Sequence, residues 1–409
     1  MKMSLKIGYL IPEFPGQTHA FFWREIKALE KMGVTVDVVS TRLPNQKIMS
    51  HHWTEVAQSR TTYLFPLKNY LKILEEFAHY GFYNAIKVFK PALTAENHSL
   101  KERTRLIALG IIGVEISLIA RKKQWDHLHV HSCADAANIA MMANRLSGLS
   151  YSIALHGSLK DYGKNQEQKW SCASFAIVIT QKLYQEVKTT ISKYLPSKIR
   201  IAPMGVDNNE FTRTQPYCHY ENGEILVFSC GRLNPCKGHK YLIEAIHLLQ
   251  DQGFQIKLMI AGEDEEGGNG YRKTLEDLIR HLELEESVKL LGAISEIKIK
   301  ENLEQAHLFA LASLEEPLGV ATMEAMAMEI PVVVTDAGGV RELVNHNVEG
   351  KLVKPESSAE LADAIRDIVT NSDLAIRMGK AGRKKILSSF SSERSANVLL
   401  ETINSLSTI

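Results

Sequence analysis

The sequence has little cysteine and no excess of one charge. Five of the 409 residues are cysteines, and none of them forms a C-x-x-C pair or has the spacing of a zinc site. This argues against a disulfide framework and predicts reduced thiols in a cytosolic protein. Lys and Arg number 48 against 47 Asp and Glu, a formal charge of +1. Such a balance argues against nucleic acid as the main partner, because duplex binding usually leaves a strongly basic surface.

Long apolar runs are lacking as well. The amino terminus enters a predicted strand directly, without the apolar region of a signal peptide. The longest apolar run, Leu106 to Ala120, is interrupted by Glu115 and is followed by three basic residues. That run is too short and too charged to span a bilayer. We therefore expect a cytoplasmic protein that is not integral to a membrane.

What is present is a soluble composition and a regular alternation of strand and helix patterns. The hydrophobic content is 45% and the charged content 23%, and a chain of this length exceeds one ordinary core. The alternation predicts parallel sheets built from βαβ units. The first series of predicted strands is Leu5–Leu10, Val34–Ser40, His127–His131, Tyr151–Leu155, Phe175–Thr180 and Ile199–Ala202. The second is Ile225–Cys230, Ile256–Ala261, Val288–Leu291, Leu308–Leu311, Pro331–Thr335 and Lys351–Val353.

A polar stretch without periodicity, Pro203 to Gly223, separates the two series and is the predicted linker. The expected fold class is therefore α/β, with two Rossmann-like doubly wound domains that face a central cleft. Ligands of such sheets bind at the carboxyl ends of the strands. Residues 68–125 depart from this rhythm and carry Lys, Phe, Tyr and Leu at helical spacing. They form either ordinary helices over the first sheet or a basic, aromatic face that contacts a membrane peripherally or receives a lipid-linked acceptor.

The most informative segment is Ser313 to Val344. Glu316 and Glu324 stand there with seven residues between them, and a Pro-Leu-Gly turn lies in that gap. A turn that leads into a helix presents unpaired N–H groups and a partial positive charge, which suit a phosphate. A carboxylate on either side can accept hydrogen bonds from sugar hydroxyls. This arrangement fits a ligand with phosphates in its middle and polyols at both ends, such as a nucleotide sugar.

A second motif, SCGRLNPCKGHKY, covers Ser229 to Tyr241. It follows a strand and places Arg232 and Lys237 five residues apart. A guanidinium and an ammonium can bracket a diphosphate and stabilise the charge that grows on a leaving nucleotide. Two cations can do this without a metal, and the sequence has no D-x-D pair for one. We therefore expect that no metal and no other cofactor is required.

These motifs resemble those of the retaining glycosyltransferases of family 4, on the GT-B fold. The similarity rests on the GRLNPCKG turn, the EPLGVATMEAMA segment and the GGVREL turn. The opening IPEFPGQTHAFFWREIKAL is similar to the entry of the subgroup that builds exopolysaccharide and colanic-acid-type repeat units. The resemblance implies an acceptor-binding domain at residues 1–205 and a donor-binding domain at 206–389. It also implies that a terminal helix, about 390–409, packs back on the first domain.

The resemblance implies a role for each matching residue. Glu316 would contact hydroxyls of the transferred sugar, Glu324 would bind the ribose, and Arg232 and Lys237 would bind the diphosphate. Further donor contacts are expected at Gly16, Gly231, Gly292, Ile294, Leu318, Gly319 and Val320. His156 is expected near the reacting carbon, so the expected catalytic set is Glu316, His156, Arg232 and Lys237. On the acceptor side the candidates are His131 and Asp161.

Two departures from the family pattern are visible. Glu329 stands where the family has a helix-capping glycine, so we expect local strain or a different turn. Cys236 beside Lys237 predicts sensitivity to thiol reagents. In addition His127, His129 and His131 alternate and therefore share one face of a strand, a pattern compatible with a metal, although we expect none.

The predicted function is hexosyl transfer from a nucleotide-diphosphate sugar to a glycan, lipid-linked or small-molecule acceptor, most simply in polysaccharide biosynthesis. A UDP-sugar is favoured over a GDP-sugar on family frequency alone. The alternatives are a non-catalytic nucleotide-sugar-binding scaffold and a sugar-nucleotide epimerase of the same architecture. An NAD oxidoreductase is disfavoured, because the first strand is followed by PEFPGQTH with one glycine and not by G-x-G-x-x-G.

Overall fold

Two parallel sheets organise the chain. The computed structural model describes residues 5–46, 49–67, 70–221 and 223–406. Residues 68 and 69 of the basic, aromatic segment and residue 222 of the predicted linker therefore lie outside the described residues. The first sheet has the strand order β3-β2-β1-β4-β5-β6-β7 and the second has the order β10-β9-β8-β11-β12-β13. This confirms the α/β class with two Rossmann-like domains.

The strands follow the apolar runs of the sequence closely. In the first sheet they are β1 Lys6–Glu13, β2 Thr35–Arg42, β3 Thr62–Tyr63, β4 His127–Val130, β5 Tyr151–Leu155, β6 Phe175–Val178 and β7 Ile199–Ile201. In the second they are β8 Ile225–Cys230, β9 Ile256–Ala261, β10 Val288–Gly292, β11 Leu308–Leu311, β12 Val332–Thr335 and β13 Gly350–Val353. Strand β3 was not predicted, because two residues carry no periodicity.

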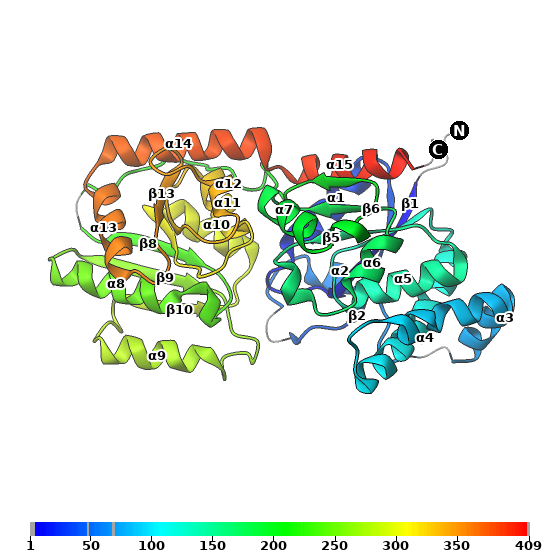
Figure 1. Cartoon of the computed structure of the whole chain (residues 1–409). Coiled ribbons are helices and arrows are strands. Elements are labelled where there is room, and N and C mark those ends of the chain that lie inside the picture. Colours follow the sequence, from blue (N-terminus) through cyan, green and yellow to red (C-terminus); the bar gives the residue numbers. More distant parts are fainter. Residues whose placement is uncertain (1–4, 47–48, 68–69, 222, 407–409) are drawn as a thin grey trace.

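Helices cover both sheets (Figure 1). Those of the first domain are α1 Ala20–Lys31, α2 Thr54–Arg60, α3 Tyr70–Thr94, α4 Leu100–Lys123, α5 Asp135–Ser147, α6 Gln166–Cys172 and α7 Gln181–Thr190. Those of the second are α8 His239–Asp251, α9 Tyr271–His281, α10 Glu296–Gln305, α11 Val320–Ala327, α12 Val340–Leu343, α13 Ser358–Val369 and α14 Ser372–Ser389. Short 3-10 turns occur at Leu159–Tyr162, Ser192–Tyr194 and Pro235–Lys237.

The last helix, α15 (Ser392–Asn404), joins the two domains. Figure 1 shows α14 lying along the second domain and α15 continuing over the first. Helix α15 packs on α1, and the backbone of Ser392 bonds to Val206 between the two sheets. A cluster of buried apolar side chains, Phe211 and Phe390 among them, runs from the first domain into the second. The carboxyl-terminal segment thus ties the domains together on one side of the cleft.

Residues 70–123 form a helical projection from the first domain. Helix α4 packs on α5, and α3 packs on α4 away from the sheet (Figure 1). A capping box of Ser99 and Glu102 fixes the start of α4. Within the described residues no helix is long and apolar enough to cross a membrane. Helix α4 is buried mainly from Leu106 onward, while α3 keeps several large apolar side chains exposed, and membrane contact through this segment stays a prediction.

Candidate functional site

A cavity of about 490 Å³ lies between the two domains, at the carboxyl ends of their strands. The first domain contributes segments that follow β1, β4 and β5, and the second contributes segments that follow β8 and β11. This is the edge at which parallel α/β sheets bind ligands. Most of the predicted site residues line it, namely His131, His156, Gly231, Arg232, Lys237, Glu316, Leu318, Gly319, Val320 and Glu324.

Glu316 stands at the centre of the second domain's wall. Its Oε2 accepts hydrogen bonds from Lys237 Nζ at 2.5 Å and from Ser313 Oγ at 3.1 Å, and the residue is 7% exposed. The glycine turn at Gly338 holds the backbone behind it. A Cβ at Gly338 would meet the Glu316 carbonyl oxygen at 2.0 Å, and its φ of +63° also favours glycine. The glycine turn at Gly338 therefore packs directly against the backbone of Glu316 and fixes its position.

The turn after β8 presents both predicted cations to the cavity. Asn234 accepts from the Cys236 N–H and shapes the 3-10 turn that carries Lys237. Gly238 lets this turn approach the neighbouring strand end, because a Cβ there would meet the Ala312 carbonyl oxygen at 2.0 Å. Lys237 lines the cavity and is paired with Glu316.

Arg232 also has a carboxylate partner. Its Nη1 lies 2.9 Å from Glu265 Oε1, and the Glu265 side chain is 71% exposed. Glu265 belongs to an acidic loop that follows β9. A diphosphate at Arg232 would compete with this surface ion pair, which no local sequence pattern predicts.

Glu324 is held by the opposite domain. Arg24 of α1 donates to its Oε1 at 2.7 Å and also donates to Glu296 of α10, with Glu210 4.0 Å away. Burial raises the pKa of Glu324, although Arg24 opposes the shift. Burial alone would lower the pKa of Arg24, but Glu324 and Glu296 raise it. Sequence reasoning missed Arg24 and Glu296, although a charged pair inside the apolar run AFFWREIKAL was a visible signal.

The predicted histidine pair comes together at the first domain's wall. His131 Nδ1 lies 3.0 Å from His156 Nε2, and both residues line the cavity. Burial lowers the pKa of each ring to about 3, which keeps both neutral at pH 7. Asp161, the other acceptor candidate, does not line the cavity and is exposed. The neighbouring Tyr162 lines it instead.

His127 and His129 have hydrogen-bonding partners of their own. His127 contacts Ser150 and Ser152 at 2.8 and 2.7 Å, and His129 contacts Ser152 at 2.7 Å. The shared serine confirms that the two rings lie on one face of β4. Among the described residues, Glu25, His129 and His131 place one possible metal-ligand atom each within 4.8 Å of one another. The expectation that no metal is required stays a prediction.

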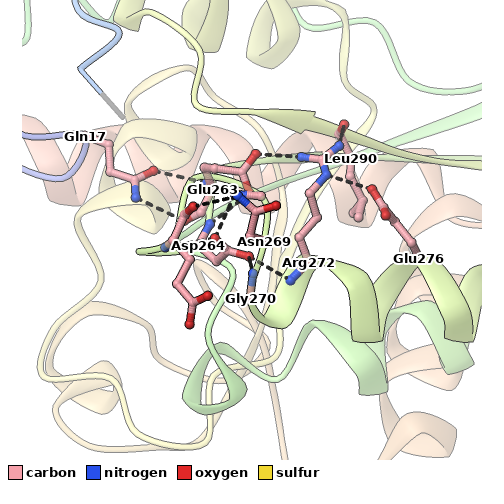
Figure 2. Close-up of polar contacts among 10 residues, drawn as sticks. Gln17, Glu263, Asp264, Asn269, Gly270, Arg272, Glu276 and Leu290 are labelled. Atoms are coloured by element: carbon pink, nitrogen blue, oxygen red, sulfur yellow. Dashed lines mark hydrogen bonds and ion pairs between the residues drawn. The ribbon is translucent and has the colours of Figure 1, made fainter. Parts of the chain in front are cut away.

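The loop after β9 is built around one buried carboxylate (Figure 2). Asp264 accepts from the backbone N–H groups of Glu266, Gly268, Gly270 and Arg272, at 2.8 to 3.0 Å. Arg272 bridges the loop to Glu263, Glu276 and the Leu290 carbonyl. Such bonds lower the pKa of Asp264, against the effect of its burial.

Gln17 reaches this loop from the first domain. Its side-chain amide donates to the Glu263 carbonyl at 3.0 Å and accepts from the Glu263 N–H at 3.1 Å (Figure 2). Three predicted donor residues, Gly16, Gly292 and Ile294, do not line the cavity. Gly16 is buried, Gly292 accepts from the Gly262 N–H at 2.8 Å, and the Ile294 carbonyl accepts from Ser50 at 2.8 Å. Their donor contacts stay predictions.

Comparison with known proteins gives a family match and several relatives. Residues 219–385 match the family model described as glycosyl transferases group 1. A GDP-mannose-dependent alpha-(1-6)-phosphatidylinositol monomannoside mannosyltransferase of Mycobacterium tuberculosis is 28% identical over 61% of this chain and 69% of its own. An amylovoran biosynthesis glycosyltransferase of Erwinia amylovora is 34% identical over 41% of each chain.

The fold has solved counterparts as well. An Anabaena protein in complex with UDP-glucose has a TM-score of 0.73 at 19% identity, over 98% of this chain and 100% of its own. At that identity the likeness concerns the fold, which is the GT-B arrangement. The match to the family model, and not the fold, favours a transferase over the binding scaffold and the epimerase.

Proposed function

We propose that the chain, whose residues 219–385 match the family model for glycosyl transferases group 1 and whose fold is GT-B, is a glycosyltransferase that carries out retaining, metal-independent hexosyl transfer. The donor is a nucleotide-diphosphate sugar. The acceptor is a glycan, a lipid-linked sugar or a small molecule, most simply in polysaccharide biosynthesis. The observation that carries the proposal is the meeting of Arg232, Lys237 and Glu316 at one wall of the interdomain cavity.

The donor is proposed to lie along the second domain. Its diphosphate contacts Arg232, Lys237 and the N–H groups at the start of α11, where the helix dipole adds positive potential. Its sugar hydroxyls contact Glu316. The two side chains that would meet at the phosphate–sugar junction, Lys237 and Glu316, are 2.5 Å apart. A donor therefore enters a site whose charges are already ordered.

The proposed reaction breaks the bond between the anomeric carbon and the nucleotide's phosphate oxygen. The acceptor hydroxyl attacks the same face, so the configuration is retained, and the departing phosphate accepts the hydroxyl proton. Arg232 and Lys237 stabilise the charge that grows on the phosphate more in the transition state than in the ground state. They supply positive charge at the place where other transferases use a divalent cation.

The catalytic assignment is tested by turnover. We expect Lys237→Ala and Glu316→Ala each to lower turnover about a hundredfold or more, as when one preorganised electrostatic contact is lost. Lys240→Ala, an exposed lysine three residues on, is the matched control and should keep turnover within about twofold of wild type. The measurement is nucleotide release from a panel of nucleotide sugars. Wild-type turnover in either cavity variant would refute the assignment.

The base is proposed to be uridine. The mycobacterial relative is named for GDP-mannose and the Anabaena structure for UDP-glucose, so both bases need testing. A thermal-shift titration with UDP, GDP and ADP decides between them. We expect the largest shift with UDP and a smaller one in Glu324→Gln, which keeps the side chain's size. A larger shift with GDP would overturn the choice of base and leave the transferase standing.

The acceptor side is proposed to face the inner surface of a membrane through α3. Exposed on this helix are Tyr70 (65%), Leu71 (76%), Leu74 (63%), Tyr83 (74%), Ile86 (51%) and Leu93 (74%). Lysines interleave with them, and Lys87 lies over the Tyr83 ring. Such a face suits an anionic interface. Co-sedimentation with anionic vesicles should fall in Leu71→Ser/Leu74→Ser, and equal binding by wild type and variant would exclude this face.

A further inference from the structure

A buried carboxylate lies behind the cavity histidines. Glu25 of α1 is 3% exposed, and its Oε2 lies 3.2 Å from His131 Nε2. The Tyr9 hydroxyl donates to the same oxygen at 2.6 Å, and Ser395 Oγ of α15 donates to Oε1 at 2.7 Å. Glu25 is thus fixed from the sheet and from the carboxyl-terminal helix. It does not line the cavity.

The carboxylate determines which nitrogen of His131 carries the proton. Nε2 lies 3.2 Å from Oε2 without the geometry of a hydrogen bond, but at that distance the carboxylate would repel a nitrogen lone pair and attract an N–H, which favours the proton on Nε2. The ring is neutral, since burial lowers its pKa to about 3. Its Nδ1 is therefore an acceptor. Nδ1 lies 3.0 Å from His156 Nε2, which must then be the donor of that hydrogen bond.

The same reasoning fixes His156. Burial lowers the pKa of its ring to about 3, so a neutral ring with a proton on Nε2 keeps a lone pair on Nδ1. The rings of Phe21 and Phe22 pack against it at 5.7 and 5.5 Å between centroids. His156 is partly exposed and lines the cavity, with Glu316 of the second domain also in the lining. Its Nδ1 is the ring nitrogen left for a ligand.

We propose that Glu25 and His131 are positioning residues that hold His156 as an acceptor for a sugar hydroxyl in the cleft. This rests on the proposed function, because the hydroxyl belongs to the transferred sugar or to the acceptor. A His156 with its proton on Nδ1 would instead present a donor and would suit a different ligand atom. The chain of contacts therefore determines what the first domain recognises.

The direct test is the tautomer of His156, measured by nitrogen-15 NMR of the imidazole in the full-length protein. Wild type should show the proton on Nε2. Glu25→Gln can present an N–H to His131 and should shift His156 toward the Nδ1–H form. His131→Phe, which keeps a ring beside Tyr9, removes the acceptor of the His156 Nε2 proton and should lower the Nε2–H fraction toward that of a free imidazole. Ser395→Ala, which loses only the bond to the other carboxylate oxygen, is the matched control and should leave the tautomer unchanged.

Kinetics provide the second readout. Glu25→Gln and His131→Phe should each lower turnover at least about tenfold, with the Kd of UDP within about twofold of wild type. The double variant should be no worse than either single one, because both act through His156. An Nδ1–H tautomer in wild type, or an unchanged tautomer and turnover in both variants, overturns the inference. A wild type that transfers no sugar would refute the proposed function, while the NMR result would still decide the inference.

Discussion

The charged side chains of the cavity have internal partners. Lys237 pairs with Glu316, Arg232 with Glu265, and Glu324 with Arg24. Each pair lowers the cost of holding a charge in a partly buried site, and it does so with groups that a donor can replace. The pairs differ in exposure, and so they should differ in how strongly they resist replacement.

The exposed pair gives the first prediction. Because Glu265 competes with the diphosphate for Arg232, Glu265→Ala should lower the Kd of UDP, by up to about fivefold for a pair worth at most about 1 kcal/mol. Glu266→Ala makes the same charge change in the same loop and is the control for the loop's general negative potential. Calorimetric titration of both variants decides. Equal effects in the two would show that direct competition is absent.

Sequence reasoning found the residues whose role depends on a local motif. Glu316, Arg232 and Lys237 lie in turns that chain geometry alone directs toward the strand ends, and all three line the cavity. It missed Arg24 and Glu25, whose partners are 300 and 370 residues away along the chain. No local pattern carries such contacts. Asp161 lies outside the cavity lining while the next residue, Tyr162, lies within it, so a contact of Asp161 with the acceptor stays a prediction.

Among the elements, the end of α11 shows how one substitution is accommodated. Glu329 has a φ of +57°, the left-handed conformation that a glycine cap would adopt. The turn is kept because α14 packs closely on it: a Cβ at Gly379 would meet the Glu329 carbonyl oxygen at 2.1 Å. Of the two expected outcomes, local strain is therefore the one observed.

This predicts a stabilising substitution. Glu329→Gly should raise the free energy of unfolding by about 1 kcal/mol, since a side chain costs about that much in the left-handed region. Glu329→Ala is the control: it also removes the 3.5 Å contact with Arg383 but keeps the strain, so it should give no gain. Denaturant unfolding measures both. An equal gain in the two variants would locate the cost in the side chain and not in the backbone.

Secondary-structure elements were predictable from sequence where a short apolar run could only form a buried strand. Strands β8, β9 and β11 coincide with the predicted ranges because both faces of a central parallel strand are covered. The sequence pattern predicted that α3 and α4 are helical, but it did not predict where they pack. Whether they cover the sheet or project from it depends on their contacts with α5. Packing partners, and not propensity, decided that case.

At the scale of the whole molecule, a buried ionic cluster joins the two domains and the segment between them. Burial and Glu296 raise the pKa of Glu210 to about 7. The folded state therefore binds a proton that the unfolded state releases between about pH 4.5 and 7, and wild type loses stability as the pH rises through this window. Glu210→Gln should remove that loss, a gain of about 1 kcal/mol at pH 8 for a partly exposed group.

The check on Glu210 is the difference in melting temperature between variant and wild type at pH 5 and pH 8. The difference should grow toward pH 8. Glu221→Gln changes an exposed glutamate in the same connecting segment and should show no such trend. A constant difference for Glu210→Gln would mean that the carboxyl titrates alike in the folded and unfolded states.

Arg24 is the centre of the same cluster, and its loss should affect both domains. Its side chain is 4% exposed and faces the carboxylates of Glu296 and Glu324 in the second domain. Arg24→Gln leaves these acids buried without a cation, which should cost about 3 to 5 kcal/mol of unfolding free energy. Lys27→Gln, on the same helix with a side chain 47% exposed, is the control and should cost less than about 0.5 kcal/mol.

A double variant distinguishes two possible sources of the stability lost in Arg24→Gln. If the destabilisation comes from the buried acids that lose their cation, Arg24→Gln/Glu324→Gln should be more stable than Arg24→Gln alone. The double variant removes one of the buried negative charges together with Arg24. If it comes from lost packing of the long side chain on Phe211, 4.8 Å from the guanidinium carbon to the ring centroid, the double variant should be no more stable. The first result would mean that Glu324, the proposed ribose contact, is electrostatically coupled to Arg24 of the first domain. A nucleotide whose ribose hydroxyls donate to Glu324 would then alter the cleft through Arg24, and small-angle scattering of wild type and Arg24→Gln with UDP would show whether the response depends on this residue.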